Sequence, residues 1–334
     1  MDDAAHERGV VWHAAMHYRA LDELIVDMGG FAEAGVRAGD AVLVAAGGVA
    51  LDRLRGRLGG QTDGVTWLDL SPLGSNPRRV MSGMRLFAEG HRGRPVRIAR
   101  QAGWLTRPAD EVREAMRYEP LLDLAVGPVR LLCAFDARLD AAVLDCAERT
   151  HRLVGRGGRW TPSRSYASSA QLPRECDSPL APPPADAAVL TFRRDHARVR
   201  DFVAGRARAA GLDADRAADL ILAVSELTAN THAHTSRPGT VTLWRTDAEI
   251  ICQVHDSGHI TDPLAGSLPP DLSATSKGWG LWVVNQVCDL VETRTAPGGT
   301  TTRVHMRLRH PPPARRPPAS SDGGAREQPP LGNT

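Results

Sequence analysis

The stretch SELTANTHAHT, residues 225–235, places a carboxylate at Glu226, an amide at Asn230 and an imidazole at His234. On a helix these side chains follow one another at a spacing of four residues and share a face. The amide oxygen of Asn230 is a ligand type that Mg²⁺ accepts, and a carboxylate beside such a metal can orient or deprotonate a nucleophile. The same spacing is common on solvated helices, so the pattern needs support from other segments.

A second polar feature follows at VHDSG, where Asp256 ends a predicted strand and Gly258 turns the chain. A carboxylate at a strand end can accept a hydrogen bond from an exocyclic amine such as that of adenine. Glycine lets the backbone approach a flat ring closely. The alternative interpretation is an ordinary turn.

Two further segments suit the other parts of a nucleotide. In SKGWGLWVV, Gly278 and Gly280 open a predicted helix whose first N–H groups form an anion site, and Lys277 stands beside it. In GGTTT, Thr300 begins a strand that is expected to lie beside Asp256. Each feature alone is more often structural, but their order and spacing together favour one site.

These residues are positioned by a segment of alternating strands and helices between two proline-rich stretches. Most of its strands are expected to pair antiparallel with the helices on one side, which makes an α/β sandwich. The predicted strands are 187–192, 239–246, 249–256, 291–296 and 300–308, and the predicted helices are 195–212, 213–235 and 278–290. Asp213 is the expected N-cap of the second helix.

The order ExxxN, DxG, GxG and GT resembles the N, G1, G2 and T boxes of GHKL (Bergerat-fold) ATPases. AVSELTANTHAHT and GWGLWVVNQVCDLVE are similar to the anti-sigma-factor serine kinases within that group. The resemblance implies ATP and Mg²⁺ as ligands. By this resemblance, Glu226 would be the catalytic base and Asn230 the magnesium ligand, Asp256 would bind adenine, and Thr300 would support adenine binding. Gly278 and Gly280 would shape the phosphate lid, at the loop that holds Lys277. Gly258 matches its box, but HITDP follows it where the family often has a second glycine or a proline, and this departure bears on the lid.

The resemblance implies a serine/threonine kinase that acts on an anti-sigma-factor antagonist in transcriptional control. A different class stays open, in which ATP binding sets a surface that sequesters a sigma factor without phosphotransfer. A third alternative is a slow ATPase that acts as a timer. A sensor histidine kinase is disfavoured because His196 lacks the acidic-then-proline context of a phosphoacceptor and follows a linker rather than a partner helix.

The first half, about residues 8–155, alternates strands and helices and predicts a mostly parallel sheet with flanking helices. Strands are expected at 10–17, 41–46, 65–70, 96–101 and 129–136, and helices at 20–37, 51–58, 77–91, 108–125 and 138–149. VLVAAGGVALDRLRGRLGG lacks the GK[ST] ending of a phosphate-binding loop.

WHAAMHYRALDELIVDMGG, YEPLLDL, CAFDA and ERTH resemble the MEDS sensory domains, which look like degenerate relatives of RecA-type folds and are thought to sense small molecules. A small-molecule ligand is therefore expected for this domain. Polar residues near strand ends that could line its pocket are His13, His17, Tyr18, Glu119 and Asp136, but such residues are more often satisfied core groups, and no site is assigned.

The composition of the 334 residues sets further limits. A net charge of +2 gives no indication of nucleic acid or a membrane surface. The five cysteines include no CxxC pair, which argues against a disulfide framework or a zinc site and favours a reducing compartment. No apolar run is long enough to span a membrane, so we expect a cytoplasmic protein. Residues 156–186 are a predicted linker, 187–310 the ATP-binding domain and 311–334 a disordered tail; a homodimer is left open.

Overall fold

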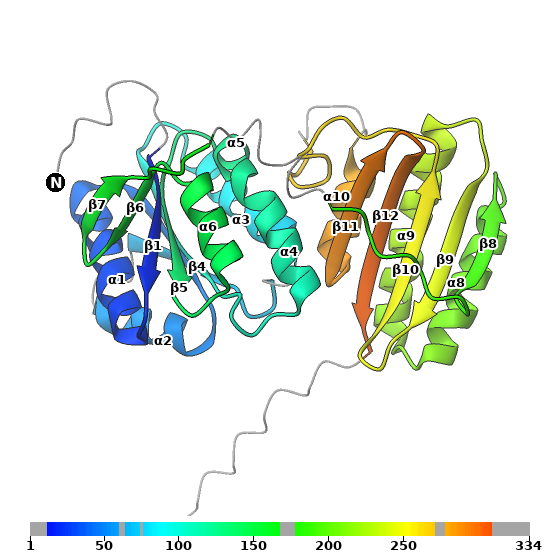
Figure 1. The fold of residues 1–334 in the computed structure, drawn as a ribbon, viewed down its shortest axis with the longest axis horizontal. Coiled ribbons are helices and arrows are strands. Elements are labelled where there is room, and N and C mark those ends of the chain that lie inside the picture. The colour runs from blue at the N-terminus through cyan, green and yellow to red at the C-terminus, as the bar shows by residue number, and fades with distance from the viewer. Residues whose placement is uncertain (1–11, 60–63, 74–75, 168–177, 271–277, 309–334) are drawn as a thin grey trace, which may run out of the picture.

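The computed structural model describes residues 12–59, 64–73, 76–167, 178–270 and 278–308, which form two α/β domains side by side (Figure 1). The predicted tail and Lys277 lie outside these ranges. Each domain has its own sheet and its own hydrophobic core. The α/β class expected for the chain is confirmed.

The first domain is built on a seven-stranded sheet in the order β3-β2-β4-β5-β1-β6-β7. Its pairings are parallel except for the hairpin of β6 and β7. The β2 sequence AVLVAA is buried at every position, as expected for a parallel strand covered on both faces. The strands are β1 (Trp12–Tyr18), β2 (Ala41–Ala46), β3 (Val65–Asp69), β4 (Val96–Ala102), β5 (Arg130–Asp136), β6 (Leu153–Arg156) and β7 (Arg159–Pro162).

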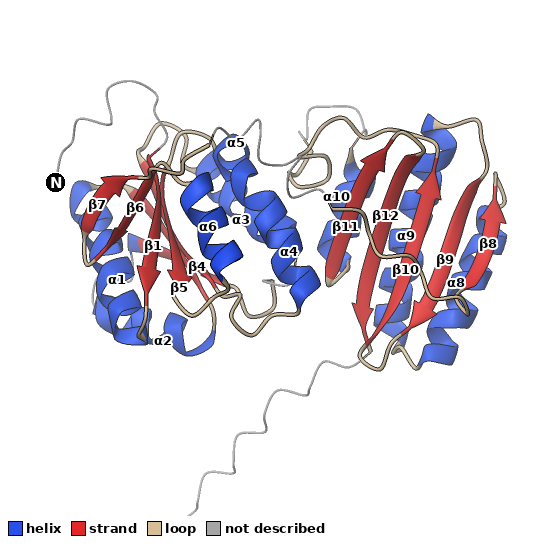
Figure 2. Cartoon of the chain, viewed as in Figure 1, coloured by secondary structure: helices blue, strands red, loops and turns tan. Residues whose placement is uncertain are grey.

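Helices cover both faces of this sheet (Figure 2). One core lies against α1 and α2, and the other against α3 to α6, so the domain has three layers. The helices are α1 (Leu21–Ala38), α2 (Gly48–Leu58), α3 (Pro77–Gly90), α4 (Ala109–Tyr118), α5 (Leu122–Val126) and α6 (Ala141–Thr150). The single helix expected over 108–125 is instead α4, a 3-10 turn η3 (Glu119–Leu121) and α5, because Pro120 lacks an N–H to continue an α-helix.

The second domain has a five-stranded antiparallel sheet in the order β11-β12-β10-β9-β8, with its core packed under α8, α9 and α10. Figure 1 shows the three helices behind the sheet. The strands are β8 (Ala188–Phe192), β9 (Gly239–Arg245), β10 (Glu249–Asp256), β11 (Leu290–Ala296) and β12 (Gly299–Arg307); the helices are α8 (His196–Ala210), α9 (Ala214–His234) and α10 (Trp279–Val287). This is the expected layout.

The segment expected to be a linker has structure at both ends. Strand β7 lies within it and pairs with β6, a difference from the sequence prediction. Its last part crosses the open face of the second sheet in Figure 1, where Arg294 and Arg303 donate hydrogen bonds to the carbonyls of Ser178 and Ala181 at 3.0 and 2.6 Å. Prolines in this stretch exclude regular structure, but they leave carbonyl acceptors for the two guanidinium groups.

Candidate functional site

Helix α9 carries the first pair of candidate residues. It begins at the N-cap Asp213, whose carboxylate accepts a hydrogen bond from Arg216 N at 2.9 Å, as the sequence predicts. Its core-facing side includes Val224 and Leu227, and this face sets the orientation of the helix on the sheet. Glu226 and Asn230 lie at the edge of that face and point toward the start of α10.

The start of α10 approaches α9 so closely that a side chain at Gly280 would displace the carboxylate of Glu226. A methyl group added to Gly280 would lie 2.7 Å from Glu226 Oε2 and 3.6 Å from the amide atoms of Asn230. Gly278 caps the helix with a positive φ of 103°. The two glycines therefore bring the helix N-terminus, with its unpaired N–H groups, next to the carboxylate and the amide.

Asp256 occupies the end of β10 and is held in place by two hydrogen bonds. Its Oδ1 accepts from the backbone N–H of Gly258 at 2.7 Å, and its Oδ2 accepts from the hydroxyl of Thr231 at 2.7 Å. Thr300 lies directly opposite Asp256 in the β10–β12 pairing and donates to the carbonyl of Gly258 at 2.8 Å. Carboxylate, turn and strand therefore form one rigid corner.

These elements surround a cavity of about 580 Å³, a volume within the usual range for small-ligand sites. Six of the eight candidate residues line it: Asn230, Asp256, Gly258, Gly278, Gly280 and Thr300. Glu226 adjoins it through the contact with Gly280, and Lys277 lies outside the described residues. Apolar side chains, among them Val254, Leu264 and Leu281, supply walls that suit a flat ring.

The cavity has two chemically different ends. Asp256, Gly258 and Thr300 provide a fixed hydrogen-bonding edge at one end. Glu226 and Asn230 lie at the other, beside the N-terminus of α10. Within the described chain their side chains make no hydrogen bond, so their polar atoms are free for a ligand. An arrangement of this kind fits a base at the first end, and phosphates with a hard cation at the second.

Sequence reasoning missed Thr231 and Thr302. Thr231 follows Asn230 directly and fixes the carboxylate of Asp256, although its sequence position suggested only a helix interior. Thr302 lines the cavity two residues after Thr300. The alternation of a strand was a usable signal for Thr302, because residues i and i+2 face the same side.

One wall of the cavity is also a contact with the first domain. Leu264 and Ala265 line the cavity, and Leu264 is buried in the core under α3 to α6. Arg78 of α3 donates to the carbonyl of Ala265 at 2.8 Å, and its guanidinium lies 4.6 Å from the ring of Tyr118. The loop after β10 is thus held by the neighbouring domain.

A second contact joins α3 to α10. Asn76 Nδ2 lies 3.2 Å from both the carbonyl and Oδ1 of Asn285, and both asparagines are fully buried. Asn285 Nδ2 in turn lies 2.8 Å from the carbonyl of Leu281 and 3.2 Å from that of Gly266. Because Leu281 and Gly266 line the cavity, this buried amide pair connects the first domain to the site.

Helix α4 makes a third contact, with the edge of the second sheet (Figure 1). Glu114 lies 2.9 Å from Arg294 of β11, and Glu111 accepts a short hydrogen bond from Arg307 of β12. The Glu114 carboxylate is fully buried and lies 3.5 Å from Arg117 as well. Burial raises the pKa of the Glu114 carboxyl group, and the charges of Arg294 and Arg117 counteract this rise only in part.

The polar residues noted in the first domain do not form one pocket. His17 lines a surface pocket of about 390 Å³, and the Tyr18 hydroxyl accepts a hydrogen bond from Gln101 at 3.3 Å. Asp136 is paired with Arg138, whose hydrogen bond lowers the pKa of the carboxyl group. His13 and Glu119 lie together in the interior, beside Cys133 and His151, which sequence reasoning did not single out as site residues.

Fold and cavity together define two joined α/β domains, the second with a cavity whose chemistry suits a nucleotide. Comparison with known families agrees. The MEDS family (MEthanogen/methylotroph, DcmR Sensory domain) matches residues 12–152, and the histidine kinase-like ATPase domain family matches residues 191–306. The chain thus carries a MEDS domain followed by a histidine kinase-like ATPase domain, and the ATPase domain implies ATP binding. A comparison with curated proteins gave no match. None of the helices in the described ranges combines the length and hydrophobicity needed to cross a bilayer.

Proposed function

We propose that the second domain binds ATP with Mg²⁺ and transfers the γ-phosphoryl group to a serine or threonine of a protein partner. The partner class we propose is an anti-sigma-factor antagonist, following the resemblance of the sequence to the anti-sigma-factor serine kinases. The observation that carries the proposal is the convergence of Glu226 and Asn230 on the glycine-lined start of α10, in a cavity that Asp256 closes at its other end.

Each residue has a role that its position supports. The amide oxygen of Asn230 would hold magnesium, which neutralises phosphate charge when bound. The carboxylate of Glu226 would accept the proton of the attacking hydroxyl, while the first N–H groups of α10 hold the phosphate oxygens. Asp256 would accept a hydrogen bond from the adenine amine. The phosphoryl group passes to the hydroxyl oxygen, and ADP leaves.

The MEDS domain would regulate this chemistry through the loop after β10. Arg78, Leu264 and the Asn76–Asn285 pair tie that loop and α10 to the first domain. A ligand that shifts α3 would therefore move the wall of the cavity. The contacts support coupling because they are buried and polar, so the two domains cannot separate there without leaving groups unpaired.

The experiment is transfer of labelled phosphate from ATP to antagonist proteins of the same genome, using the full chain. Glu226→Gln keeps the shape of the side chain, so nucleotide binding should persist while transfer falls by about a hundredfold or more. Asp219→Asn is the matched control, because Asp219 lies on α9 outside the cavity lining and should leave transfer unchanged.

The outcomes separate the candidate functions. Transfer by the unmodified protein that Glu226→Gln abolishes supports the kinase. Nucleotide binding without transfer to any antagonist contradicts it and favours ATP-dependent sequestration of a sigma factor.

A further inference from the structure

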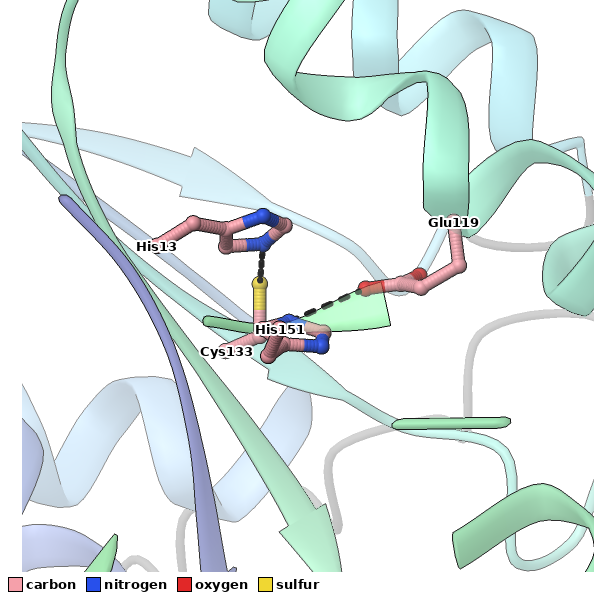
Figure 3. Close-up of side chains that lie close together, drawn as sticks. All are labelled: His13, Glu119, Cys133 and His151. Carbon is pink, nitrogen blue, oxygen red and sulfur yellow. Dashed lines mark hydrogen bonds and ion pairs between the residues drawn. The ribbon is translucent and has the colours of Figure 1, made fainter. Parts of the chain in front are cut away.

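Four side chains with metal-ligating atoms meet in the interior of the MEDS domain (Figure 3). They are His13, Glu119, Cys133 and His151, and none is more than 2% exposed. One ligand atom from each lies within 4.8 Å of all the others. A buried group of this composition needs an explanation, because interiors rarely hold ionisable side chains without a partner.

The fold brings the four residues together from separate elements. Strands β1 and β5 are parallel neighbours in which His13 pairs with Leu131, so Cys133, two residues further on, faces the same side of the sheet. Glu119 begins the 3-10 turn after α4, and His151 directly follows α6. Both therefore approach the sheet from the helical layer above that face.

Each histidine is oriented with Nε2 toward the group. His151 Nδ1 lies 2.7 Å from the carbonyl of Ala147, and because a carbonyl cannot donate, this nitrogen carries the hydrogen. Its Nε2 is then an unprotonated acceptor, with no hydrogen-bond partner among the described residues. His13 Nδ1 lies 2.8 Å from Asp123 Oδ1, and His13 Nε2 lies 3.4 Å from Cys133 Sγ. Orientation by a carbonyl or carboxylate is what metal-bound histidines usually have.

The separations suit tetrahedral coordination. Metal–ligand distances of about 2.0–2.3 Å place tetrahedral ligand atoms roughly 3.3–3.8 Å apart. His13 Nε2 and Cys133 Sγ are 3.4 Å apart, and His151 Nε2 and Glu119 Oε1 are 3.6 Å apart. The remaining pairs are within 4.8 Å, which small side-chain movements can close.

The charges around the four-residue group also favour a bound cation. Two carboxylates reach the group: Asp123 lies 2.8 Å from His13 Nδ1, and Glu119 is hydrogen-bonded to Arg100, which also contacts Cys133. A divalent ion would bind Cys133 as the thiolate and offset that charge together with the Asp123 carboxylate, which Arg100 does not pair.

We propose that His13, Glu119, Cys133 and His151 bind one divalent transition-metal ion, of the zinc or ferrous iron class. Imidazole and thiolate ligands select these ions over magnesium and calcium. The other close group, Asp110, Glu249 and His305, offers only three ligands, and its two carboxylates are partly exposed, as acidic groups without a metal commonly are. The MEDS domain would thereby contain a metal centre independent of the nucleotide site.

The test uses the full chain unfolded with a chelator and refolded with Zn²⁺ or Co²⁺, because the group is buried and the metal has to enter during folding. We expect one ion per chain by elemental analysis, a thiolate-to-cobalt absorption band in the near ultraviolet, and a higher melting temperature with metal than without. Protein that refolds to the native far-ultraviolet spectrum but holds metal only substoichiometrically overturns the proposal.

Variants localise the ion. Cys133→Ser should remove the cobalt–thiolate band, and His151→Gln should lower the metal affinity by at least about tenfold. Cys146→Ser is the matched control, since Cys146 is a buried cysteine of the same domain outside the group, and it should keep both signals. Because His151→Gln does not alter a cysteine, it tests the site even if Cys133→Ser fails to fold. Full metal content and an unchanged band in both variants would place the ion elsewhere and refute the assignment.

Discussion

Replacing Asp256 by asparagine tests the adenine end of the cavity while leaving its scaffold in place. Asparagine keeps one oxygen for the N–H of Gly258, which lies 2.7 Å from Asp256 Oδ1. Its amide group then faces Thr231, whose hydroxyl can turn to the carbonyl of Leu227 at 3.1 Å. The corner therefore stays folded, and the change falls on the ligand, because an amine donor would now meet an N–H group instead of a carboxylate.

The expected loss follows from the type of hydrogen bond removed. A bond to a charged acceptor contributes about 1.5–3 kcal/mol. This corresponds to roughly 10- to 100-fold weaker binding of ATP and ADP. Thr231 and the N–H of Gly258 already hold the carboxylate of Asp256 in one orientation, so we expect the loss nearer the upper end.

Calorimetric titration of the full chain with MgADP measures this loss, and the melting temperature checks that the variant is folded. Asp262→Asn is the matched control: Asp262 lines the same cavity and also accepts a backbone N–H bond, from Leu264 at 2.9 Å. Asp262→Asn removes the same charge from another position of the cavity, and the affinity of this variant for MgADP should stay within about threefold of that of the unmodified protein. Equal affinities for Asp256→Asn and the unmodified protein, or equal losses in the two variants, would refute the assignment of Asp256 to adenine.

Two further predictions concern stability. Gly299→Ala should lower the free energy of unfolding of the ATPase domain by about 3 kcal/mol or more in denaturant titrations. The φ of Gly299 is 128°, and the new methyl group would lie 1.9 Å from the carbonyl oxygen of Asp256. Gly298→Ala is the control and should be nearly neutral, because a methyl group at Gly298 would point into open space. His305→Gln should flatten the pH dependence of the free energy of unfolding. Burial lowers the pKa of His305, but hydrogen bonds and charges of Glu249 and Glu292 raise it to about 9, and Asp110 is a third carboxylate 4.0 Å from the ring. The folded state therefore holds a proton that the unfolded chain releases near pH 6.5, and up to about 3 kcal/mol is lost as pH rises to about 9. An equal slope in variant and unmodified protein would contradict this.

The ATPase domain could be predicted from sequence because its site is assembled from short motifs that keep their order along the chain. Glu226 and Asn230 share a helix face by spacing alone, and Asp256 and Thr300 follow from a strand end and a hairpin. The contacts of Arg78 and Asn76 with the second domain could not be predicted, because α3 reads as an ordinary amphipathic helix. Its docking on α10 depends on how two separately folded surfaces fit, which no local pattern encodes.

The buried group in the MEDS domain escaped prediction for a different reason. Cysteine spacing argued against a zinc site, but that rule detects ligands that come in close pairs along the chain. Here a single cysteine, Cys133, lies beside His13, Glu119 and His151, which come from other elements. Only the pairing of β1 with β5 brings His13 next to Cys133. In a parallel sheet, neighbouring strands are separated by long connections, so sequence distance carries little information about contact. His13 and Glu119 were recognised as polar residues near strand ends, yet their chemistry becomes apparent only when the direction of each ring nitrogen is known. The proposed metal centre therefore rests on side-chain geometry, and its four residues can guide a search for the same positions in other MEDS domains.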